Sequence, residues 1–429
     1  MPLAAEGGTR RRISRIEITP VAFSDPPLLN TVGVHEPMAI RGIVQMHTDD
    51  GLVGIGESYG DEQHLQRMRH AAECVIGTDP ANTLEMFSRV ADAMRADRSG
   101  EGHGMSGMIT GSSTVDRVFS PFEVAALDIQ GKAFDVPVSA LLGGAVRDRV
   151  EYSGYLFYRW HAHPEAEADP WGQALNPAEL VEQARRMIRE YGFSSLKLKG
   201  GVFPPDEEAE AIEAIHAEFP DVLLRIDPNG AWTVDTSVRI GRRLEGSIEY
   251  LEDPTPGRQA MAEVRSQLSV PLATNMCVVS FNDIPEAVKL GSVDIILSDP
   301  HFWGGIRRSQ LLAGLCETFG IDVSMHSNSH LGISLSAMTH LAATTPNIRY
   351  ACDTHWPWKN PEQDVISESF GMTDGRVEVP RGSGLGVTLD EDKLQERHEE
   401  YVKSGIVKRN DTGYMRKFYP EFDPSVPRW

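Results

Sequence analysis

Two lysines separated by one leucine stand in a short apolar run and could act as bases. The run reads Ser195-Leu196-Lys197-Leu198-Lys199 and is followed by two glycines. In a β-strand successive side chains point to opposite faces, so Lys197 and Lys199 share one face. Two ammonium groups this close repel each other, so we expect at least one of them to have a lowered pKa and to serve as a base. An exposed edge strand with two solvated lysines explains the pattern equally well.

Oxygen-bearing side chains end three further apolar runs. Asp227, Glu252 and Asn275 each stand at or just beyond the end of such a run. Three oxygen ligands directed at one point suit a hard cation that keeps its other positions for water or substrate, and Mg²⁺ is the natural candidate. Taken singly, each residue is more typical of a turn, because Asp-Pro and Asn are common in loops. Their regular recurrence favours a metal site.

The next two apolar runs lead to Asp299 and His326. If these runs form neighbouring strands, Asp299 can hydrogen-bond one nitrogen of His326 and fix its tautomer. It would also raise the pKa of His326, so that the imidazole carries a proton at neutral pH. A buried structural histidine is the usual alternative for a single His. The carboxylate at the adjacent run favours a catalytic pair.

These polar termini recur every 23 to 28 residues from Lys199 to His326, and amphipathic helical stretches separate them. Such βα repeats indicate a parallel sheet. We expect strands near 151–157, 194–199, 222–227, 248–252, 271–275, 293–298, 321–326 and 349–354. Eight strands predict a closed α/β barrel, in which functional groups lie at the carboxyl ends of the strands.

The chain divides into three parts. Residues 1–148 have the mixed pattern of an α+β domain, including a hairpin around Asp49-Asp50-Gly51. Residues 149–356 carry the barrel pattern, and residues 357–429 are expected to return to the first domain.

Two segments have a loop-like composition. The segment 100–113 contains five glycines, and a lid or a passive loop explains it equally well. The segment 371–390 reads as irregular polypeptide that covers the first domain.

Composition excludes several classes of protein. The 429 residues include 41 Lys and Arg against 62 Asp and Glu, a formal net charge of −21. Such a field repels nucleic acid and anionic lipid, so we expect neither as a partner. No apolar run is long enough to span a bilayer. The four cysteines match no Cys-x-x-Cys spacing, which favours a reducing, cytoplasmic location.

The polar residues predicted at the carboxyl ends of the barrel strands form what we call the rim. Together they suit abstraction of a proton next to a substrate carboxylate. A substrate carboxylate on the cation would have the lysine pair on one side and the histidine on the other. The product of proton loss carries two negative charges on one carboxyl group, and a divalent cation with a neighbouring ammonium stabilises it. A Lys or His base with magnesium holding an ene-diolate is the solution used in the enolase superfamily.

At these positions the chain resembles the glucarate dehydratase family of that superfamily, which is mandelate racemase-like. The similarity covers nearly the whole chain. It rests on the motifs Lys197-Leu198-Lys199, Asp227-Pro228-Asn229-Gly230-Ala231-Trp232, Glu252-Asp253-Pro254, Ala273-Thr274-Asn275-Met276, Asp299-Pro300-His301-Phe302-Trp303 and His326-Ser327-Asn328. The implied fold is α/β, a modified TIM barrel of the (β/α)7β type with an α+β capping domain that the C-terminal segment completes.

The third metal ligand is an amide, as in the glucarate dehydratases. Most acid-sugar enzymes of the superfamily have Glu or Asp there, whereas this chain has Asn275. Two ligand charges in place of three leave the cation less neutralised, so it attracts a dianionic substrate more strongly.

The resemblance implies dehydration of D-glucarate, and of its C5 epimer L-idarate, to 5-dehydro-4-deoxy-D-glucarate. Lys199 would remove the C5 proton from one epimer, with Lys197 supporting the enediolate. His326 would remove it from the other epimer and would assist departure of the C4 hydroxyl. Asn328 looks like a further active-site residue.

The resemblance also implies a substrate-binding set: Asn30, His35, Thr114, Tyr155 and His355. Asn30 and His35 match positions that contact the far end of the substrate. The match at Thr114 is poor, because the segment 112–117 departs from the family pattern. Ordinary packing is the alternative for His35, Tyr155 and His355.

Three other functions compete with this reading. An epimerase or racemase could use the same two bases, and a dehydratase could act on galactarate or altrarate. A family member reduced to binding or scaffolding would keep the fold without the activity. By analogy with similar barrels we also expect a homo-oligomer.

Overall fold

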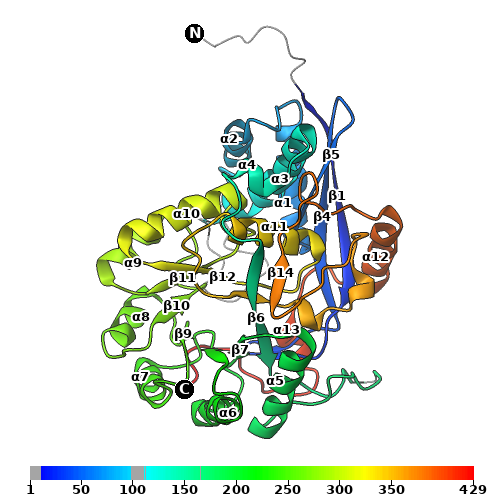
Figure 1. Ribbon diagram of the computed structural model, residues 1–429. Helices are drawn as coiled ribbons and strands as arrows, with labels where there is room; N and C mark the ends of the chain where they lie inside the picture. The colour runs from blue at the N-terminus through cyan, green and yellow to red at the C-terminus, as the bar shows by residue number, and fades with distance from the viewer. Residues whose placement is uncertain (1–10, 98–110, 112, 165) are drawn as a thin grey trace.

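The computed structural model describes residues 11–97, 111, 113–164 and 166–429 (Figure 1). The glycine-rich segment 100–113, predicted as a lid or passive loop, lies outside the described residues except for Gly111 and Ser113.

Eight parallel strands form the barrel sheet, in the order β12-β11-β10-β9-β8-β7-β6-β13. The strands are β6 (Arg149–Phe157), β7 (Ser195–Lys199), β8 (Leu223–Asp227), β9 (Tyr250–Glu252), β10 (Leu272–Thr274), β11 (Ile295–Ser298), β12 (Asp322–Met325) and β13 (Cys352–Thr354). All eight lie within a few residues of the predicted positions. The edge strands β12 and β13 meet where Ser324 Oγ donates to the carbonyl oxygen of Ala351 at 3.1 Å and Val323 forms a bridge with Ile348.

A helix follows each of the first seven strands, so the predicted (β/α)7β architecture is confirmed (Figure 1). The helices are α5 (Pro177–Tyr191), α6 (Pro205–Glu218), α7 (Val234–Arg243), α8 (Arg258–Arg265), α9 (Ile284–Leu290), α10 (Ile306–Phe319) and α11 (Gly332–Ala343). Local signals set their ends. In α5 the Asn176 side chain accepts the Glu179 N–H at 3.1 Å, and Gly192 ends the helix at φ 73°.

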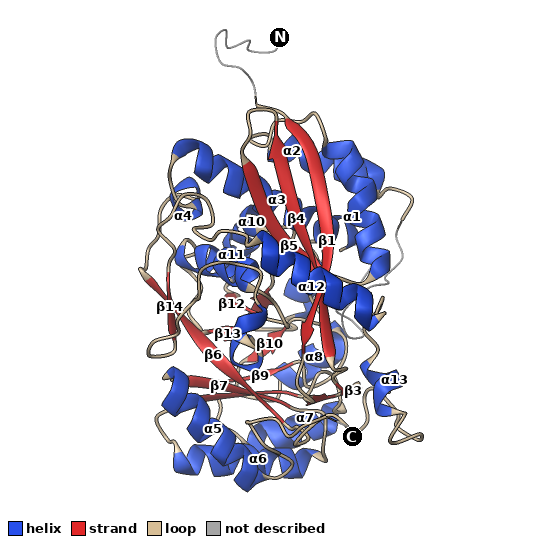
Figure 2. Ribbon diagram, turned by 90° about the vertical axis from the view of Figure 1, so that its right-hand side faces the viewer, coloured by secondary structure: helices blue, strands red, loops and turns tan. Residues whose placement is uncertain are grey.

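The N-terminal domain caps the barrel (Figure 2). Its antiparallel sheet has the order β1-β4-β5. The strands are β1 (Ile13–Ser24), β4 (Met38–Thr48) and β5 (Val53–Tyr59), with a small ladder of β2 (Leu29–Asn30) and β3 (Gly33–Val34). The predicted hairpin is the β4–β5 pair. The helices are α1 (Glu62–Val75), α2 (Thr83–Ala93), α3 (Thr114–Phe134) and α4 (Val138–Leu141).

Helix α3 packs directly on β5 because β5 has glycines at the contact. A Cβ atom at Gly56 would lie 2.2 Å from the carbonyl oxygen of Pro121, and one at Gly54 would lie 2.1 Å from that of Ala125. Only residues without a side chain allow this approach. The close packing fixes the position of the β5 end, which carries Tyr59.

Helix α11 joins the two domains and is buried along its whole length. On the barrel side, Tyr152 of β6 and Thr339 share a hydrogen bond of 2.8 Å. On the capping side, the Glu57 carboxylate accepts the N–H groups of Leu331 and Ser334, each at 2.9 Å. An apolar, all-round buried helix is the expected element between two layers.

The C-terminal part touches both domains. It contains two short 3-10 helices, η1 (Trp356–Trp358) and η2 (Pro361–Gln363), then β14 (Arg376–Glu378), α12 (Glu391–Ser404) and α13 (Asp411–Met415). The prediction that 371–390 is irregular polypeptide is wrong for β14, which pairs antiparallel with barrel strand β6. Its short length and charged ends gave no alternating pattern to recognise. Further on, the Leu385 N–H donates to Asp128 Oδ1 at 2.8 Å, as the expected return to the first domain requires.

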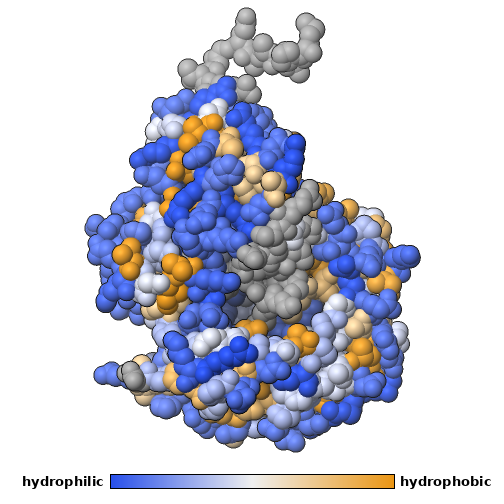
Figure 3. All heavy atoms as spheres, turned by 180° about the vertical axis from the view of Figure 1, so that it is seen from behind, coloured by the Kyte–Doolittle hydropathy of each residue, from blue (hydrophilic) through white to orange (hydrophobic). Residues whose placement is uncertain are grey.

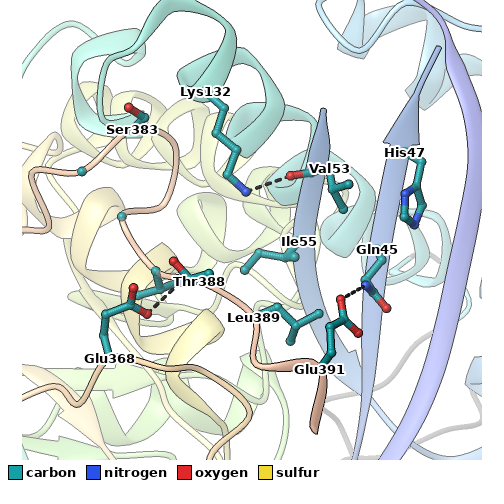
Figure 4. Close-up of a pocket in the computed structure, with 13 residues that line it drawn as sticks. Gln45, His47, Val53, Ile55, Lys132, Glu368, Ser383, Thr388, Leu389 and Glu391 are labelled. Carbon is teal, nitrogen blue, oxygen red and sulfur yellow. Dashed lines mark hydrogen bonds between the residues drawn. The ribbon is translucent and has the colours of Figure 1, made fainter. Parts of the chain in front are cut away.

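A cavity of about 450 Å³ lies between this returning segment and the capping sheet (Figure 4). Gln45 Nε2 donates to Glu391 Oε1 at 2.8 Å on one side of it, and Lys132 Nζ donates to the Val53 carbonyl oxygen at 2.8 Å on the other. None of the predicted site residues lines this cavity.

Hydrophilic residues cover most of the described surface seen in Figure 3, and hydrophobic residues form small separate groups. Within the described ranges, no helix is long and apolar enough to cross a membrane.

Candidate active site

The lysine pair lies inside the barrel and not on a solvated edge. Lys197 is fully buried, and its Nζ donates to Glu252 Oε2 at 2.6 Å and to Asp353 Oδ2 at 2.5 Å. Lys199 Nζ donates to Asp227 Oδ2. Burial alone would lower the pKa of Lys197, but Asp353, Glu252 and Asp227 raise it above the ordinary value. Lys197 is therefore not the lysine with a lowered pKa that the sequence led us to expect.

Asp227, Glu252 and Asn275 follow one another at the carboxyl ends of β8, β9 and β10. All three are buried. Glu252 Oε1 and both polar atoms of the Asn275 side chain have no hydrogen-bond partner in the described part of the chain. Buried oxygen atoms are normally paired, so these atoms fit a cation held between them.

The turns beyond these strands hold Asp227 and Asn275 in place. Asn229, at φ 50°, donates from its backbone N and from Nδ2 to the two oxygens of Asp227, each at 2.9 Å. Asp253, at φ 35°, accepts the Asn275 N–H at 2.8 Å. Left-handed backbone at two adjacent strand ends is strained for residues other than glycine, and such strain is concentrated at functional sites.

The two carboxylates differ electrostatically. Burial would raise the pKa of Asp227, but Lys199 and Lys197 hold it below its ordinary value. Burial and the charge of Asp227 raise the pKa of Glu252 well above its ordinary value. Across the described ranges, no three His, Cys, Asp or Glu side chains gather as a metal site.

His326 and Asp299 form the expected pair across β12 and β11. His326 Nδ1 lies 3.3 Å from Asp299 Oδ2, and both residues are buried. Burial would raise the pKa of Asp299, but His301 and His326 hold it well below its usual range. Asp299 does act to raise the pKa of His326, as predicted, but the expected net rise is wrong for the protein alone. Burial lowers that pKa, Asp299 opposes the effect without cancelling it, and Lys197 and Lys199 add to the lowering.

A second histidine, which the sequence did not single out, shares the same carboxylate. His301 Nδ1 lies 2.6 Å from Asp299 Oδ1, and its Nε2 lies 3.0 Å from Arg41 Nη2. Tyr59 donates its hydroxyl to Asp299 Oδ2 at 3.5 Å and accepts from Asn328 Nδ2 at 3.3 Å. His301 stands two residues after Asp299, which was a usable signal. Arg41 and Tyr59 come from the capping domain, and no local pattern connects them to the barrel.

The lysines lie next to a cluster of aromatic side chains that contains three of the predicted substrate-binding residues. Lys197 Nζ lies 4.9 Å from the centroid of the Tyr155 ring, and the Tyr155 hydroxyl donates to the Ser327 carbonyl oxygen at 3.0 Å. The rings of Tyr155 and His355 are 5.3 Å apart, and those of His355 and His35 stack at 6.0 Å. Tyr155, His355 and His35 therefore form one contiguous surface.

The remaining predicted substrate residues are less directly placed. Asn30 donates from Nδ2 to Asp411 at 3.4 Å, and its Oδ1 accepts the Val32 N–H at 2.8 Å, so both ends of its amide are engaged. Thr114 is buried at the start of α3. One turn further along α3, the Arg117 guanidinium lies 6.0 Å from the centroid of the Tyr59 ring. It is therefore on the same side of the site as Asp299 and His326.

The C-terminal segment contributes a buried cation that the sequence did not indicate. Arg409 Nη1 pairs with Asp25 Oδ2 at 2.8 Å, and its Nε pairs with Asp411 Oδ1 at 2.9 Å. The same Asp25 oxygen lies 3.1 Å from His35 Nδ1. Arg409 thus braces the loop that carries His35, from a position 374 residues away along the chain.

The fold and this rim define a class of enzyme, and sequence comparison agrees. Residues 179–393 match the family model described as enolase C-terminal domain-like, and residues 18–143 match the mandelate racemase / muconate lactonizing enzyme N-terminal domain. The chain belongs to this family of the enolase superfamily.

Individual relatives narrow the class further. A probable glucarate dehydratase from Streptomyces coelicolor is 49% identical over 428 residues, which cover 97% of this chain and 99% of the relative. This similarity identifies the protein as a dehydratase-type enzyme, a hydro-lyase. A crystal structure of an enolase from Mycobacterium smegmatis, complexed with formate and acetate, is 59% identical with a TM-score of 0.95 and covers 98% of this chain and 99% of that chain. An enolase from Pseudomonas fluorescens with bound magnesium, potassium and tartrate is 45% identical, also with a TM-score of 0.95, and covers 98% of this chain and 100% of that chain.

Proposed function

We propose that the protein dehydrates an acid sugar of the aldarate class, with D-glucarate and its C5 epimer L-idarate as first candidates and 5-dehydro-4-deoxy-D-glucarate as product. The observation that carries this proposal is the arrangement of one cluster of oxygen ligands between two kinds of base. Lys197 and Lys199 stand at the end of β7, and His326 stands at the end of β12. Proton abstraction from either face of a carbon acid requires such an arrangement.

Asp227, Glu252 and Asn275 would hold Mg²⁺. When bound, the cation supplies a Lewis acid for the substrate carboxylate and stabilises negative charge as it develops. The unpaired buried oxygens of Glu252 and Asn275 support this assignment. The relative with bound magnesium and tartrate supports it as well, because tartrate is a hydroxylated dicarboxylate like the proposed substrates.

The lysines have separate tasks in this proposal. Lys199 removes the C5 proton from one epimer. Lys197, held as a cation between Glu252 and Asp353, faces the carboxylate on which the second negative charge develops. A fixed ammonium group in a buried site stabilises such a charge without having to reorganise.

His326 acts on the opposite face. Its lowered pKa favours the neutral imidazole, which is the form that abstracts a proton. Its Nδ1 faces Asp299, and among the described residues Nε2 has no hydrogen-bond partner, so Nε2 is the reacting atom. As an acid toward the C4 hydroxyl, His326 has to be protonated, and a dianionic substrate beside it raises its pKa in that direction.

The far end of the substrate would lie against Asn30 and His35. The further expected substrate contacts are Tyr155, His355 and Thr114, and Asn328 is a further expected active-site residue. Burial raises the pKa of Tyr155 well above its ordinary value, so its hydroxyl stays a neutral donor. This assignment of substrate contacts carries over from the family resemblance.

The test is a screen for 2-ketoacid release from D-glucarate, L-idarate, galactarate and altrarate in the presence of Mg²⁺. We expect turnover of the first two, lost on chelation. Lys199→Ala and His326→Asn should each lower it by at least about 100-fold, within the range expected of acid–base groups. His340→Asn is the matched control, because His340 is a buried histidine whose imidazole, among the described residues, has its hydrogen bond with the Leu385 carbonyl oxygen at 3.2 Å, away from the candidate site.

Each alternative has its own signature in the screen. Release from galactarate or altrarate alone identifies a different aldarate dehydratase. Interconversion of epimers without ketoacid identifies an epimerase. Binding of a diacid without any reaction identifies a catalytically inactive family member. Self-association stays an expectation, which light scattering of the full chain measures.

A further inference from the structure

The Asp299 carboxylate has more partners than a simple Asp–His pair requires. Oδ1 accepts the backbone N–H of His301 at 2.9 Å and faces His301 Nδ1 at 2.6 Å. Oδ2 faces His326 Nδ1 at 3.3 Å and Tyr59 Oη at 3.5 Å. The two oxygens are therefore divided, one held by His301 and the other shared by His326 and Tyr59.

The contacts of His301 fix which of its nitrogens carries a proton. Its Nε2 lies 3.0 Å from Arg41 Nη2 and 2.8 Å from Ser334 Oγ. An arginine nitrogen can only donate, so Nε2 has to accept. The proton of a neutral imidazole then sits on Nδ1 and is donated to Asp299 Oδ1. His301 is thus a fixed donor that does not compete with His326 for a proton.

Arg41 is itself held by the capping domain. Its Nε pairs with Glu57 Oε1 at 2.8 Å, inside the β4–β5 hairpin. The same Glu57 carboxylate accepts the N–H groups of Leu331 and Ser334 at the start of α11. The contacts therefore close a ring from the capping hairpin to α11, on to His301, and back through Arg41.

Tyr59 provides a second, independent contact from the capping domain. Its hydroxyl lies between Asp299 and Asn328, and the Arg41 guanidinium lies 4.5 Å from its ring centroid. Burial and Asp299 raise the pKa of Tyr59 far above its ordinary value, so the hydroxyl remains protonated. A protonated hydroxyl that accepts from Asn328 can donate to Asp299.

We propose that His301 and Tyr59 are positioning residues for proton transfer by His326: together they hold Asp299 in the orientation that keeps His326 Nε2 free to face the substrate. The capping domain, through Arg41 and Tyr59, thereby sets the geometry of one base, while among the described residues the Lys199 ammonium donates to Asp227 of barrel strand β8. This inference rests on the proposed abstraction of a proton next to a carboxylate.

The experiment uses an aldarate that lacks the 4-hydroxyl group, so that proton abstraction is observed without elimination. Exchange of the C5 proton in D₂O with Mg²⁺ present is followed by proton NMR. The two C5 epimers are tested separately, because one presents its proton to Lys199 and the other to His326. Nitrogen NMR of the protein alone reports, independently of turnover, whether Nδ1 of His326 carries the proton.

The structure predicts an effect on one face only. His301→Leu removes the side-chain donor to Asp299 but keeps the backbone N–H, and it should slow exchange of the His326-dependent epimer by about 100-fold. Tyr59→Phe should slow it by about 10-fold, as expected when a reacting group is displaced slightly. Exchange of the Lys199-dependent epimer should stay close to that of the parent. In His301→Leu the nitrogen spectrum should show a mixture of His326 tautomers.

Conservative and remote variants separate positioning from damage to the fold. His301→Asn keeps an N–H near the position of Nδ1 and should restore most of the lost rate. Tyr152→Phe and His340→Asn are the matched controls, because both residues are buried and have polar partners away from Asp299. Neither should affect one epimer more than the other.

Three results would overturn the inference. These are equal losses for both epimers, no loss in either His301→Leu or Tyr59→Phe, and a single unchanged His326 tautomer in both variants. If the parent exchanges neither epimer, the proposed function fails instead, and the nitrogen spectra still decide whether His301 and Tyr59 position His326.

Discussion

Lys197 and His326 stand on opposite sides of the same ligand cluster, but different parts of the molecule hold them. Lys197 lies between Glu252 and Asp353, which both belong to barrel strands. Asp299, the partner of His326, is held by His301 and Tyr59, and through His301 by Arg41. One side of the rim is thus complete within the barrel, whereas the other is complete only when the capping domain is in place.

Because of this difference, we expect that the two proposed proton-transfer faces, that of Lys199 and that of His326, can be altered separately. A change at Lys197 or at its carboxylate partners should affect stability and both faces. A change in the capping domain should affect mainly the His326 face. The following predictions test that division, starting from the largest expected effect.

The largest effect is expected inside the barrel. Lys197→Met leaves the buried carboxylates of Glu252 and Asp353 without their shared cation. Breaking a buried ion pair from one side costs about 3–5 kcal/mol of unfolding free energy, which denaturant titration measures. Arg185→Met, which breaks an exposed pair with Glu218, should change stability far less. Equal effects of the two substitutions would contradict the barrel side of the comparison.

A buried carboxylate at the contact between the capping domain and the barrel should make the free energy of unfolding depend on pH. Burial raises the pKa of Glu123 to about 7, although the carboxylate accepts the Ile306 and Arg307 N–H groups. The folded protein therefore binds this proton more tightly than the unfolded chain does. Its contribution is complete below pH 4.5 and is lost as the pH rises to 7, a change of about 3 kcal/mol in unfolding free energy.

Glu123→Gln should remove that part of the slope of unfolding free energy against pH. Glu208, whose pKa burial also raises to about 7, lies within the barrel and serves as the comparison. Glu208→Gln should reduce the slope of unfolding free energy against pH without affecting the contact between the capping domain and the barrel. An unchanged slope in Glu123→Gln would show that Glu123 is ionised in the folded protein at acidic pH.

Magnesium should stabilise the folded protein through the barrel side of the rim. At free Mg²⁺ one hundred times its dissociation constant, the gain is about 2.7 kcal/mol, measurable as a rise in Tm. Asn275→Leu should abolish the rise. Asn347→Leu should keep it, because Asn347 donates to the Ala313 carbonyl oxygen outside the cluster. A full rise in Asn275→Leu would remove Asn275 from the ligand set.

The smallest effect concerns the capping domain. Gly56→Ala places a Cβ atom against the Pro121 carbonyl oxygen and should cost about 1–3 kcal/mol through overpacking. It should also displace Tyr59, three residues along β5, and so slow exchange at the His326 face more than at the Lys199 face. Gly314→Ala, with no atom within 4 Å of the added Cβ, should instead stabilise the protein slightly.

The sequence was most informative where function and fold share one local pattern. From β7 to β12, a polar residue stands at or just beyond the end of each strand, so strand positions and candidate residues could be predicted together. The same reasoning placed Asp299 and His326 on neighbouring strands, which the structure confirms.

The sequence was least informative about contacts between distant segments. Asp353 lies 156 residues from Lys197, and its charge reverses the expected shift in the pKa of Lys197. The depth of burial, which lowers the pKa of His326, is a property of the assembled protein. Arg41 and Tyr59 belong to another domain, and alternation along β4 and β5 says nothing about what lies above them.

The contacts between residues 409–415 and the loop around His35 affect the order in which parts of the protein fold during synthesis. Asn30 and Asp411 are in contact although 381 residues separate them. A ribosome finishes all eight barrel strands long before it adds Arg409. Until then the nascent chain lacks Arg409 and Asp411, which contact the loop around His35, so the loop that we propose binds substrate is completed among the last events of biogenesis.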